Sequence, residues 1–569
     1  MKPSGDISAF INAPDTVDFI VRSSDYLLHQ LGESEDVLVT KELSGGYTIC
    51  YTKEENLPKI QKLLGTGFIS AISILLGVLD RPSLEASGIT QIQIQPYLEL
   101  TGRGVLLGFV DTGIDYTLPI FRYEDGTSKI RSIYDQTVAG TPPQGHYIGT
   151  EYTYEQINKA LAAPNPAEIV PQKDIDGHGT FLASVAAGRS LGDFTSAAPD
   201  AELIVVKAKT ARPYYIKRYA IPKDQQNAFE SSAVMDGVEY ILEQAEALKR
   251  PVVICIGLGT NLGSHDGFSI LEEYFSGISS FKGVCICTAA GNECQARHHT
   301  QGTIATQGGY SNIDIKVGED GGDVYLSVWN NASDRMSVAV RSPTGEVFGR
   351  VAARSGVVLE QKLVLEPSTI SLEFHFPVEG SSGQLTIVKI LSATPGIWTV
   401  TMYGDIILGG VYNAWLPLTG FVSPEIEFLS ANPYTTVTVP STMFGGINCG
   451  AYDHTNNSLY AQSSWGPTRI QFQAPDIISP GVDVGGYYPT GQGVMSGTSV
   501  AAAITAGACA LMLQWGVVMG NDVAMSTYQI KAYLIRGCNR NEAMIYPNSQ
   551  WGYGTLNLMQ TFQLMREIT

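Results

Sequence analysis

The sequence predicts an α/β fold in which a parallel sheet is covered by helices on both faces, with a small α+β domain before it and an all-β segment inserted into it. Apolar strand-like runs alternate with helical patterns in two separate stretches, and the segment between them contains only short strand-like runs. The 569 residues are enough for two or three domains. The predicted domains are residues 1–90, an α/β domain in two parts (91–311 and 432–569), and the insertion 312–431.

The α/β domain is predicted from strands that are apolar along their whole length. The runs VLLGFVDTG, AELIVVKAK, PVVICIGLG and GVCICTAAGN show no polar alternation, and two helical patterns, GTFLASVAAG and AFESSAVMDGVEYILEQAEALK, lie among them. Strands of this kind are typical of parallel sheets that are buried between two helical layers.

The other two segments have different patterns. The first combines an alternating stretch, DVLVTKELSGGYTICYT, with a helical run, NLPKIQKLLG, which predicts a compact α+β domain. In residues 312–431, runs such as VYLSVW, MSVAV and IWTVTMY are separated by turn residues, a pattern typical of a β-sandwich or jelly-roll. Because the α/β pattern resumes afterwards with GGINCGAYD, we expect the jelly-roll to be an insertion rather than a terminal module.

Composition excludes several classes of function. The chain has 55 acidic and 36 basic residues and a formal net charge of −19, so we expect no nucleic-acid partner, which would require a basic face. No run reaches the 18 apolar residues of a membrane span, and none is expected. The N-terminus lacks a basic segment followed by an apolar one, so we expect no Sec signal peptide and a cytoplasmic location.

The eight cysteines are predicted to be buried, reduced thiols, because several lie in apolar runs such as VVICIG and GVCICTAAG. No CxxC pair or Cys/His spacing typical of a metal site is present, so no metal and no cofactor are assigned. Calcium stays open, because DIDG supplies Asp174 and Asp176, although no contiguous oxygen-ligand loop is present.

Three short motifs place polar side chains at the ends of predicted elements. Asp111 in VDTGID follows a buried strand, while His178 in DGHGT and Ser499 in SGTSVAAAITAG each stand at the start of a small-residue helix. Helix N-termini carry unpaired N–H groups and a positive dipole end, which stabilise developing anions. Each residue alone is explained more simply as a turn or cap residue. The prediction of a nucleophilic site therefore depends on all three together.

A fourth residue fits the same chemistry. Asn292 in TAAGNE stands at the end of a buried strand, where its side-chain amide can donate to a tetrahedral oxyanion. Loss of one such donor typically raises the barrier by about 3 kcal/mol. Alone, Asn292 is equally well explained as a turn residue.

Together these motifs resemble the signatures of the subtilase family of serine peptidases, including the order Asp, His, Ser along the chain. SSWGPT (Ser463–Thr468) and APDIISPG (Ala474–Gly481) resemble two further segments of that family, and the resemblance covers most of 98–311 and 432–569. Ala503 stands where the family usually has proline. Alanine is compatible with an unbroken helix, so this departure does not indicate inactivity.

The resemblance implies a serine endopeptidase that works through an acyl-enzyme. Ser499 would be the nucleophile, His178 the general base and acid, and Asp111 the residue that orients the imidazole. Asn292 and the Ser499 N–H would hold the oxyanion.

The resemblance also implies two partners: a protein or peptide substrate and the chain's own N-terminal domain. The substrate would pair as an added strand with Gly257, Leu258 and Gly259. Residues 1–90 resemble a subtilase prodomain, so we expect the chain to cut itself near residues 80–96. Whether the prodomain then stays bound is left open.

The insertion makes the chain resemble most the Csp germination proteases of spore-forming anaerobic bacteria. That resemblance implies activation of a spore cortex-lytic enzyme precursor and a cytoplasmic or spore-associated location. The alternatives are a clostridial-type subtilase with other protein substrates, a prodomain-blocked pseudoprotease that acts in signalling, and an esterase that uses the same triad.

Overall fold

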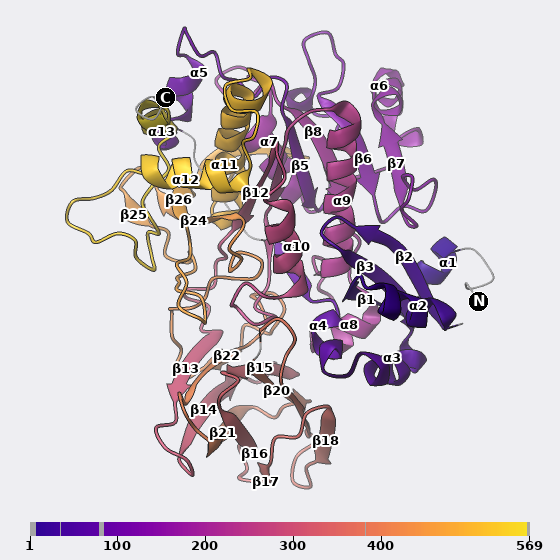
Figure 1. Cartoon of the computed structure of the whole chain (residues 1–569), viewed down its shortest axis with the longest axis vertical. Helices are drawn as coiled ribbons and strands as arrows, with labels where there is room; N and C mark the ends of the chain where they lie inside the picture. Colours follow the sequence, from indigo (N-terminus) through magenta and orange to yellow (C-terminus); the bar gives the residue numbers. More distant parts are fainter. Residues whose placement is uncertain (1–6, 35, 79–84, 382, 566–569) are drawn as a thin grey trace.

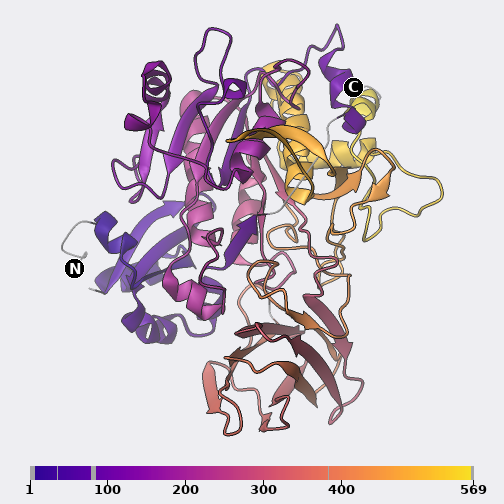
Figure 2. The same cartoon turned by 180° about the vertical axis from the view of Figure 1, so that it is seen from behind.

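The computed structural model describes residues 7–34, 36–78, 85–381 and 383–565. Within these residues the chain forms an N-terminal α+β domain, a large α/β domain and an inserted β domain (Figures 1 and 2). The two smaller domains pack against different sides of the α/β domain. The first described helix, α1 (Ile7–Asn12), and the last, α13 (Leu558–Met565), lie far apart (Figure 1).

A nine-stranded sheet forms the centre of the α/β domain. Its strands are β5 (Leu106–Asp111), β6 (Ile130–Asp135), β7 (Thr150–Thr153), β8 (Glu202–Lys207), β10 (Val252–Ile256), β12 (Val284–Ala289), β24 (Ile447–Asp453), β25 (Ser458–Leu459) and β26 (Ile477–Pro480). The order is β25-β24-β12-β10-β5-β8-β6-β7, with β26 beside β24. All pairs are parallel except β6 with β7 and β24 with β25.

Helices cover both faces of this sheet. The helices of the α/β domain are α5 (Ile89–Gln93), α6 (Tyr154–Ala162), α7 (His178–Ala187), α8 (Pro213–Arg218), α9 (Ser231–Leu248), α10 (Ile270–Ile278), α11 (Thr498–Leu513), α12 (Thr527–Gly537) and α13 (Leu558–Met565). Alternate strand residues face opposite layers: Leu107 and Phe109 share a core with α7 and α11, whereas Leu106 and Val110 share one with α9 and α10. This alternation explains why the strands are apolar throughout.

Helix α11 is buried along its whole length. Every residue from Thr498 to Leu513 is buried, and the helix packs against α7 and strands β10, β12 and β24. Small side chains permit this close packing. A Cβ at Gly507 would overlap the Cβ of Ala197, so only glycine fits there without a shift. A stretch that includes α11, Thr498–Val518, is the one candidate membrane span among the described residues; 89% of its most apolar window is buried inside the protein, as expected of a core helix.

The N-terminal domain packs against α9 and α10. It consists of α1 (Ile7–Asn12), β1 (Thr16–Arg22), α2 (Asp25–Glu33), β2 (Val37–Leu43), β3 (Tyr47–Lys53), α3 (Leu57–Leu64) and α4 (Phe68–Ala71). Its three strands form an antiparallel sheet in the order β1-β3-β2. The domain contacts both helices through side chains: Ser44 donates to Glu239 of α9, and the Tyr47 ring packs edge-on against Tyr274 of α10.

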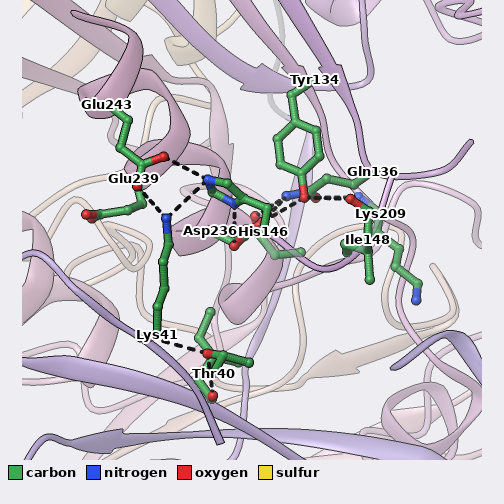
Figure 3. Close-up of polar contacts among 12 residues, drawn as sticks. Thr40, Lys41, Tyr134, Gln136, His146, Ile148, Lys209, Asp236, Glu239 and Glu243 are labelled. Atoms are coloured by element: carbon green, nitrogen blue, oxygen red, sulfur yellow. Dashed lines mark hydrogen bonds and ion pairs between the residues drawn. The ribbon is translucent and has the colours of Figure 1, made fainter. Parts of the chain in front are cut away.

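A charged cluster joins this domain to α9 (Figure 3). Lys41 of β2 forms an ion pair with Glu243, which also contacts the Nε2 atom of His146 at 3.0 Å. The Nδ1 atom of His146 lies 2.9 Å from Asp236, whose other carboxylate oxygen accepts from Tyr134. Burial alone would lower the pKa of His146, but the two carboxylates raise it to about 9, so the imidazole is cationic at neutral pH.

The inserted β domain consists of two antiparallel sheets with a shared core. Its strands are β13 (His299–Thr303), β14 (Tyr310–Val317), β15 (Val324–Asn330), β16 (Arg335–Arg341), β17 (Val347–Val351), β18 (Val357–Lys362), β19 (Thr369–His375), β20 (Gln384–Leu391), β21 (Gly396–Ile406), β22 (Val411–Trp415) and β23 (Ile426–Phe428). The sheet orders are β13-β22-β15-β20-β19-β18 and β17-β16-β21-β14-β23. Strand β13 joins the first sheet although it precedes the predicted segment 312–431.

All eight cysteines lie within the described residues, and all are buried thiols without a disulfide, as the sequence predicts. Cys285 and Cys287 face the α11 side of the sheet, where the Cys287 Sγ lies 3.7 Å from the Cys509 Sγ. Burial raises the pKa of all three thiols well above the usual value, which keeps them protonated.

The packing of α11 predicts that Gly507→Ala lowers the free energy of unfolding by about 1–3 kcal/mol, the usual range for overpacking a tight core. Denaturant unfolding in a Ser499→Ala background, which removes self-cleavage, measures the change. Ala197→Gly should recover part of the loss. Gly277 in α10 is a matched control, because nothing lies within 4 Å of a Cβ placed there. Equal stability of the Gly507→Ala and Gly277→Ala proteins would contradict this account.

The His146 cluster predicts a loss of stability at alkaline pH. The pKa of His146 is about 9 in the folded chain, above its ordinary value of 6.5. Its contribution is therefore full below about pH 6.5 and is lost as the pH rises through 9. We expect the difference in unfolding free energy between wild type and His146→Gln to shrink by up to about 3 kcal/mol between pH 7 and pH 10. Parallel pH profiles for the two proteins would exclude this role of the imidazole.

Candidate active site

Asp111 and His178 form a buried pair at the carboxyl end of β5, a central strand of the sheet. Asp111 ends strand β5, and His178 is the first residue of helix α7. The Nδ1 atom of His178 lies 2.7 Å from the Oδ1 atom of Asp111, and both side chains are almost completely buried. The backbone N–H of Gly179 donates to Thr112, which joins the two segments directly beside the pair.

The two acidic residues considered for calcium hold the start of α7. Asp174 accepts hydrogen bonds from the backbone N–H groups of Gly177 and Thr180 and from the Thr180 hydroxyl. Asp176 accepts from the His178 backbone N–H at 3.2 Å. These contacts stabilise the helix end that carries the imidazole.

Ser499 lies beside this pair, at the second position of α11. A Cβ built on Gly257 would lie 3.2 Å from the Cε1 atom of His178 and 3.3 Å from the Cβ atom of Ser499. His178 and Ser499 therefore border the same small residue. The same Cβ would lie 2.6 Å from Leu182, so a larger residue at position 257 would displace its neighbours. Within the described residues, the buried Ser499 Oγ has no hydrogen-bond partner.

Asn292 is fixed against the residue that precedes the serine. Its Oδ1 atom accepts from the backbone N–H of Thr498 at 3.1 Å and from the Thr498 hydroxyl at 3.2 Å. The amide NH₂ group therefore faces away from Thr498. The turn is held further by Gly291, whose N–H donates to Thr498 and whose carbonyl accepts from Ser464 of the SSWGPT motif. The arrangement suits donation to an oxyanion beside Ser499.

The predicted substrate-pairing segment forms a strand that is already paired. Leu258 and Gly259 make up β11, which is antiparallel to β4 (Leu75–Val78), the strand that follows the N-terminal domain. On its other side β4 pairs with β9 (Phe229–Glu230). A segment of the chain therefore occupies the middle of a three-stranded sheet, where a peptide substrate was expected.

Strand β9, which pairs with β4 on the side opposite β11, is a part of this site that was not predicted from the sequence. Glu230 at its end pairs with Arg212, which also binds the Oδ1 atom of Asp18 in β1 at 2.7 Å. All three side chains are buried. The other oxygen of Asp18 accepts from Ser73, just before β4. The dipeptide FE before a helical pattern is too short to predict a strand.

The predicted cutting region, 80–96, lies in part outside the described residues, which resume at Glu85. From there the chain belongs to the α/β domain: α5 packs beside α13 at the end of the molecule away from the N-terminal domain (Figure 1).

Among the described residues, the only group of His, Cys, Asp or Glu side chains close enough to share a metal ion is Cys285, Cys287 and Cys509. It lies in the core between β12 and α11, away from Asp174 and Asp176. The raised thiol pKa values favour protonated core side chains at these positions.

Comparison with solved structures finds the CspB protease of Clostridium perfringens. It superposes with a TM-score of 0.75 and 30% sequence identity, over 84% of this chain and 98% of that one. Two subtilisin-like proteases of Arabidopsis thaliana, SBT2.3 and SBT2.2, are 24% and 23% identical over 73% of this chain. The chain spans about half the length of these plant proteins, 56% and 55%.

The sequence model described as the subtilase family matches residues 102–346 and 421–554, which is more than half of the chain. The two matched segments contain Asp111, His178, Asn292 and Ser499. These four residues lie together at the carboxyl ends of the central strands, although most of the inserted β domain separates the two matched segments along the sequence. The chain therefore belongs to the subtilase family.

Proposed function

We propose that this chain is a serine endopeptidase that cuts peptide bonds through an acyl-enzyme on Ser499. The observation that carries the proposal is that His178 and Ser499 both border Gly257, the residue directly before strand β11. A peptide paired with β11 would run past the nucleophile with its backbone fixed in register.

The proposed steps follow from the positions of the side chains. Ser499 Oγ attacks the scissile carbonyl while His178 Nε2 takes its proton, and the imidazolium then protonates the leaving amine. The Asp111 Oδ1 atom lies 2.7 Å from the Nδ1 atom of His178, so Asp111 fixes the tautomer of the imidazole and stabilises its cationic form. The Asn292 amide and the Ser499 N–H donate to the oxyanion, where each preorganised donor typically contributes about 3 kcal/mol. Water then releases the acyl group by the same route.

The first substrate we propose is the chain itself. Support comes from β4, which holds residues 75–78 between β9 and β11, and from residues 85–93, which already belong to the α/β domain. A cut between these segments would leave the N-terminal domain as a separate chain, held by Asp18 and Lys41.

For the physiological substrate we propose the precursor of a spore cortex-lytic enzyme, processed during germination inside a spore-forming cell. This finer proposal is supported by the similarity to the Clostridium perfringens CspB protease and by the inserted β domain. Alternatives are a subtilase with other protein substrates or an esterase. The pairing of β4 with both β9 and β11 favours one further candidate, a pseudoprotease blocked by its own N-terminal domain.

We predict that the purified wild-type chain is cut and that Ser499→Ala stays intact, because the variant lacks the attacking oxygen. Intact mass and N-terminal sequencing should find the new N-terminus within residues 79–85. Ser496→Ala is the matched control: it removes another hydroxyl from the same SGTS motif and should be cut normally.

Full-length protein in all three preparations would contradict autoprocessing and favour the blocked pseudoprotease. Cutting of Ser499→Ala at the same bond would show that another protease does the work.

A further inference from the structure

Glu293 follows Asn292 directly in the chain and has no part in the proposed reaction. Its side chain is 2% exposed, which is unusual for a carboxylate. The backbone N–H of Glu293 donates to Ser464 at 3.0 Å, so the residue continues the turn that carries the oxyanion donor.

The Glu293 carboxylate accepts hydrogen bonds from three separate segments. His178 and Ser499 are not among them. Its Oε2 atom lies 2.9 Å from the Asn261 amide, two residues after β11, and 2.8 Å from the Nδ1 atom of His298, directly before β13. Its Oε1 atom accepts from the backbone N–H of Thr419 at 3.1 Å, shortly after β22.

Two of these partners lie at the ends of strands of the inserted β domain: His298 where the chain enters the insertion before β13, and Thr419 between β22 and β23. β13 and β22 pair with each other in the first sheet of the insertion. Their ends are tied again outside the carboxylate: the Leu416 N–H donates to the His298 carbonyl, and the Asn261 amide also reaches the Leu416 carbonyl. The segment that enters the insertion and the segment that follows β22 therefore meet at one side chain.

The negative charge of Glu293 strengthens its hydrogen bonds at this junction. Burial alone would raise the pKa of Glu293, but His298 and the donors around Thr419 lower it, so the carboxylate is ionised. A buried carboxylate that accepts three hydrogen bonds has little freedom, and losing one partner leaves an uncompensated polar group.

We infer that the inserted β domain holds the oxyanion turn in place through Glu293. Glu293 is then a positioning residue: it acts on the transition state through the placement of Asn292. The inference rests on the proposed function, because it concerns the same site. A small displacement of a preorganised donor reduces its stabilisation of the transition state far more than it reduces ground-state binding.

The test compares Glu293→Gln with wild type in the processed protein. Glutamine keeps the size but brings an NH₂ group against the donors of Asn261 and His298. We expect kcat on a peptide substrate to fall about tenfold with KM changed less than twofold. Affinity for a peptide boronate, whose adduct uses the oxyanion donors, should fall by a similar factor, and affinity for the same peptide as a C-terminal amide, which forms no adduct with Ser499, should not.

Glu373→Gln is the matched control. Like Glu293, Glu373 is a buried carboxylate, but it belongs to the inserted domain. It lies 3.4 Å from a histidine, His375, and pairs with Arg218 of the α/β domain, but it is not bonded to the oxyanion turn. It should lower the melting temperature without changing kcat or boronate affinity. His298→Gln keeps the Glu293 carboxylate and should also lower kcat. It replaces Glu293→Gln in the test if the Glu293→Gln protein does not fold.

Wild-type kcat and boronate affinity in both Glu293→Gln and His298→Gln, with only a lower melting temperature, would overturn the inference while leaving the proposed function intact. Absence of peptide hydrolysis by wild type would contradict the proposed function itself, and the inference with it.

Discussion

Helix α11 packs closely against the central strands, and this packing determines where the nucleophile lies relative to its neighbours. All of its residues are buried, and Gly507 allows contact with Ala197 that a side chain would prevent. The helix lies across β10, β12 and β24. Its first turn lies beside Gly257, directly after β10, and is bonded to Asn292, three residues after β12. A helix displaced outward by larger residues would separate the nucleophile from both.

Elements from distant parts of the chain are then attached to this core by buried charges. Arg212 joins Asp18 of the N-terminal domain to Glu230 at the edge of β9. Glu293 does the same for the inserted β domain. Charges of this kind are costly to bury and to leave unpaired, so they fix how the parts fit together more than they add stability. Glu230 lies in β9, which pairs with β4, and Glu293 directly follows Asn292 in the chain.

Much of this site could be predicted from local sequence. Asp111, His178, Asn292 and Ser499 each stand where a strand ends or a helix begins, and the apolar strands around them identify a parallel sheet. The pairing of β4, the role of β9 and the partners of Glu293 could not be predicted, because they depend on contacts between residues far apart in the chain. Asp174 and Asp176 illustrate another limit: their hydrogen bonds to the start of α7 could not be predicted from the sequence, because they depend on how the loop before the helix folds.

Asp111, His178 and Ser499 are proposed to act as one unit, and the rate at which a fluorophosphonate modifies Ser499 measures whether they do. The reagent needs an activated hydroxyl but no peptide-bond specificity, so the measurement is independent of the natural substrate. We expect rapid modification of Ser499 in the processed protein, with a rate at least about a thousandfold lower in His178→Ala. A wild-type rate no faster than that of His178→Ala would mean that the hydroxyl is not activated and that the three residues do not act together.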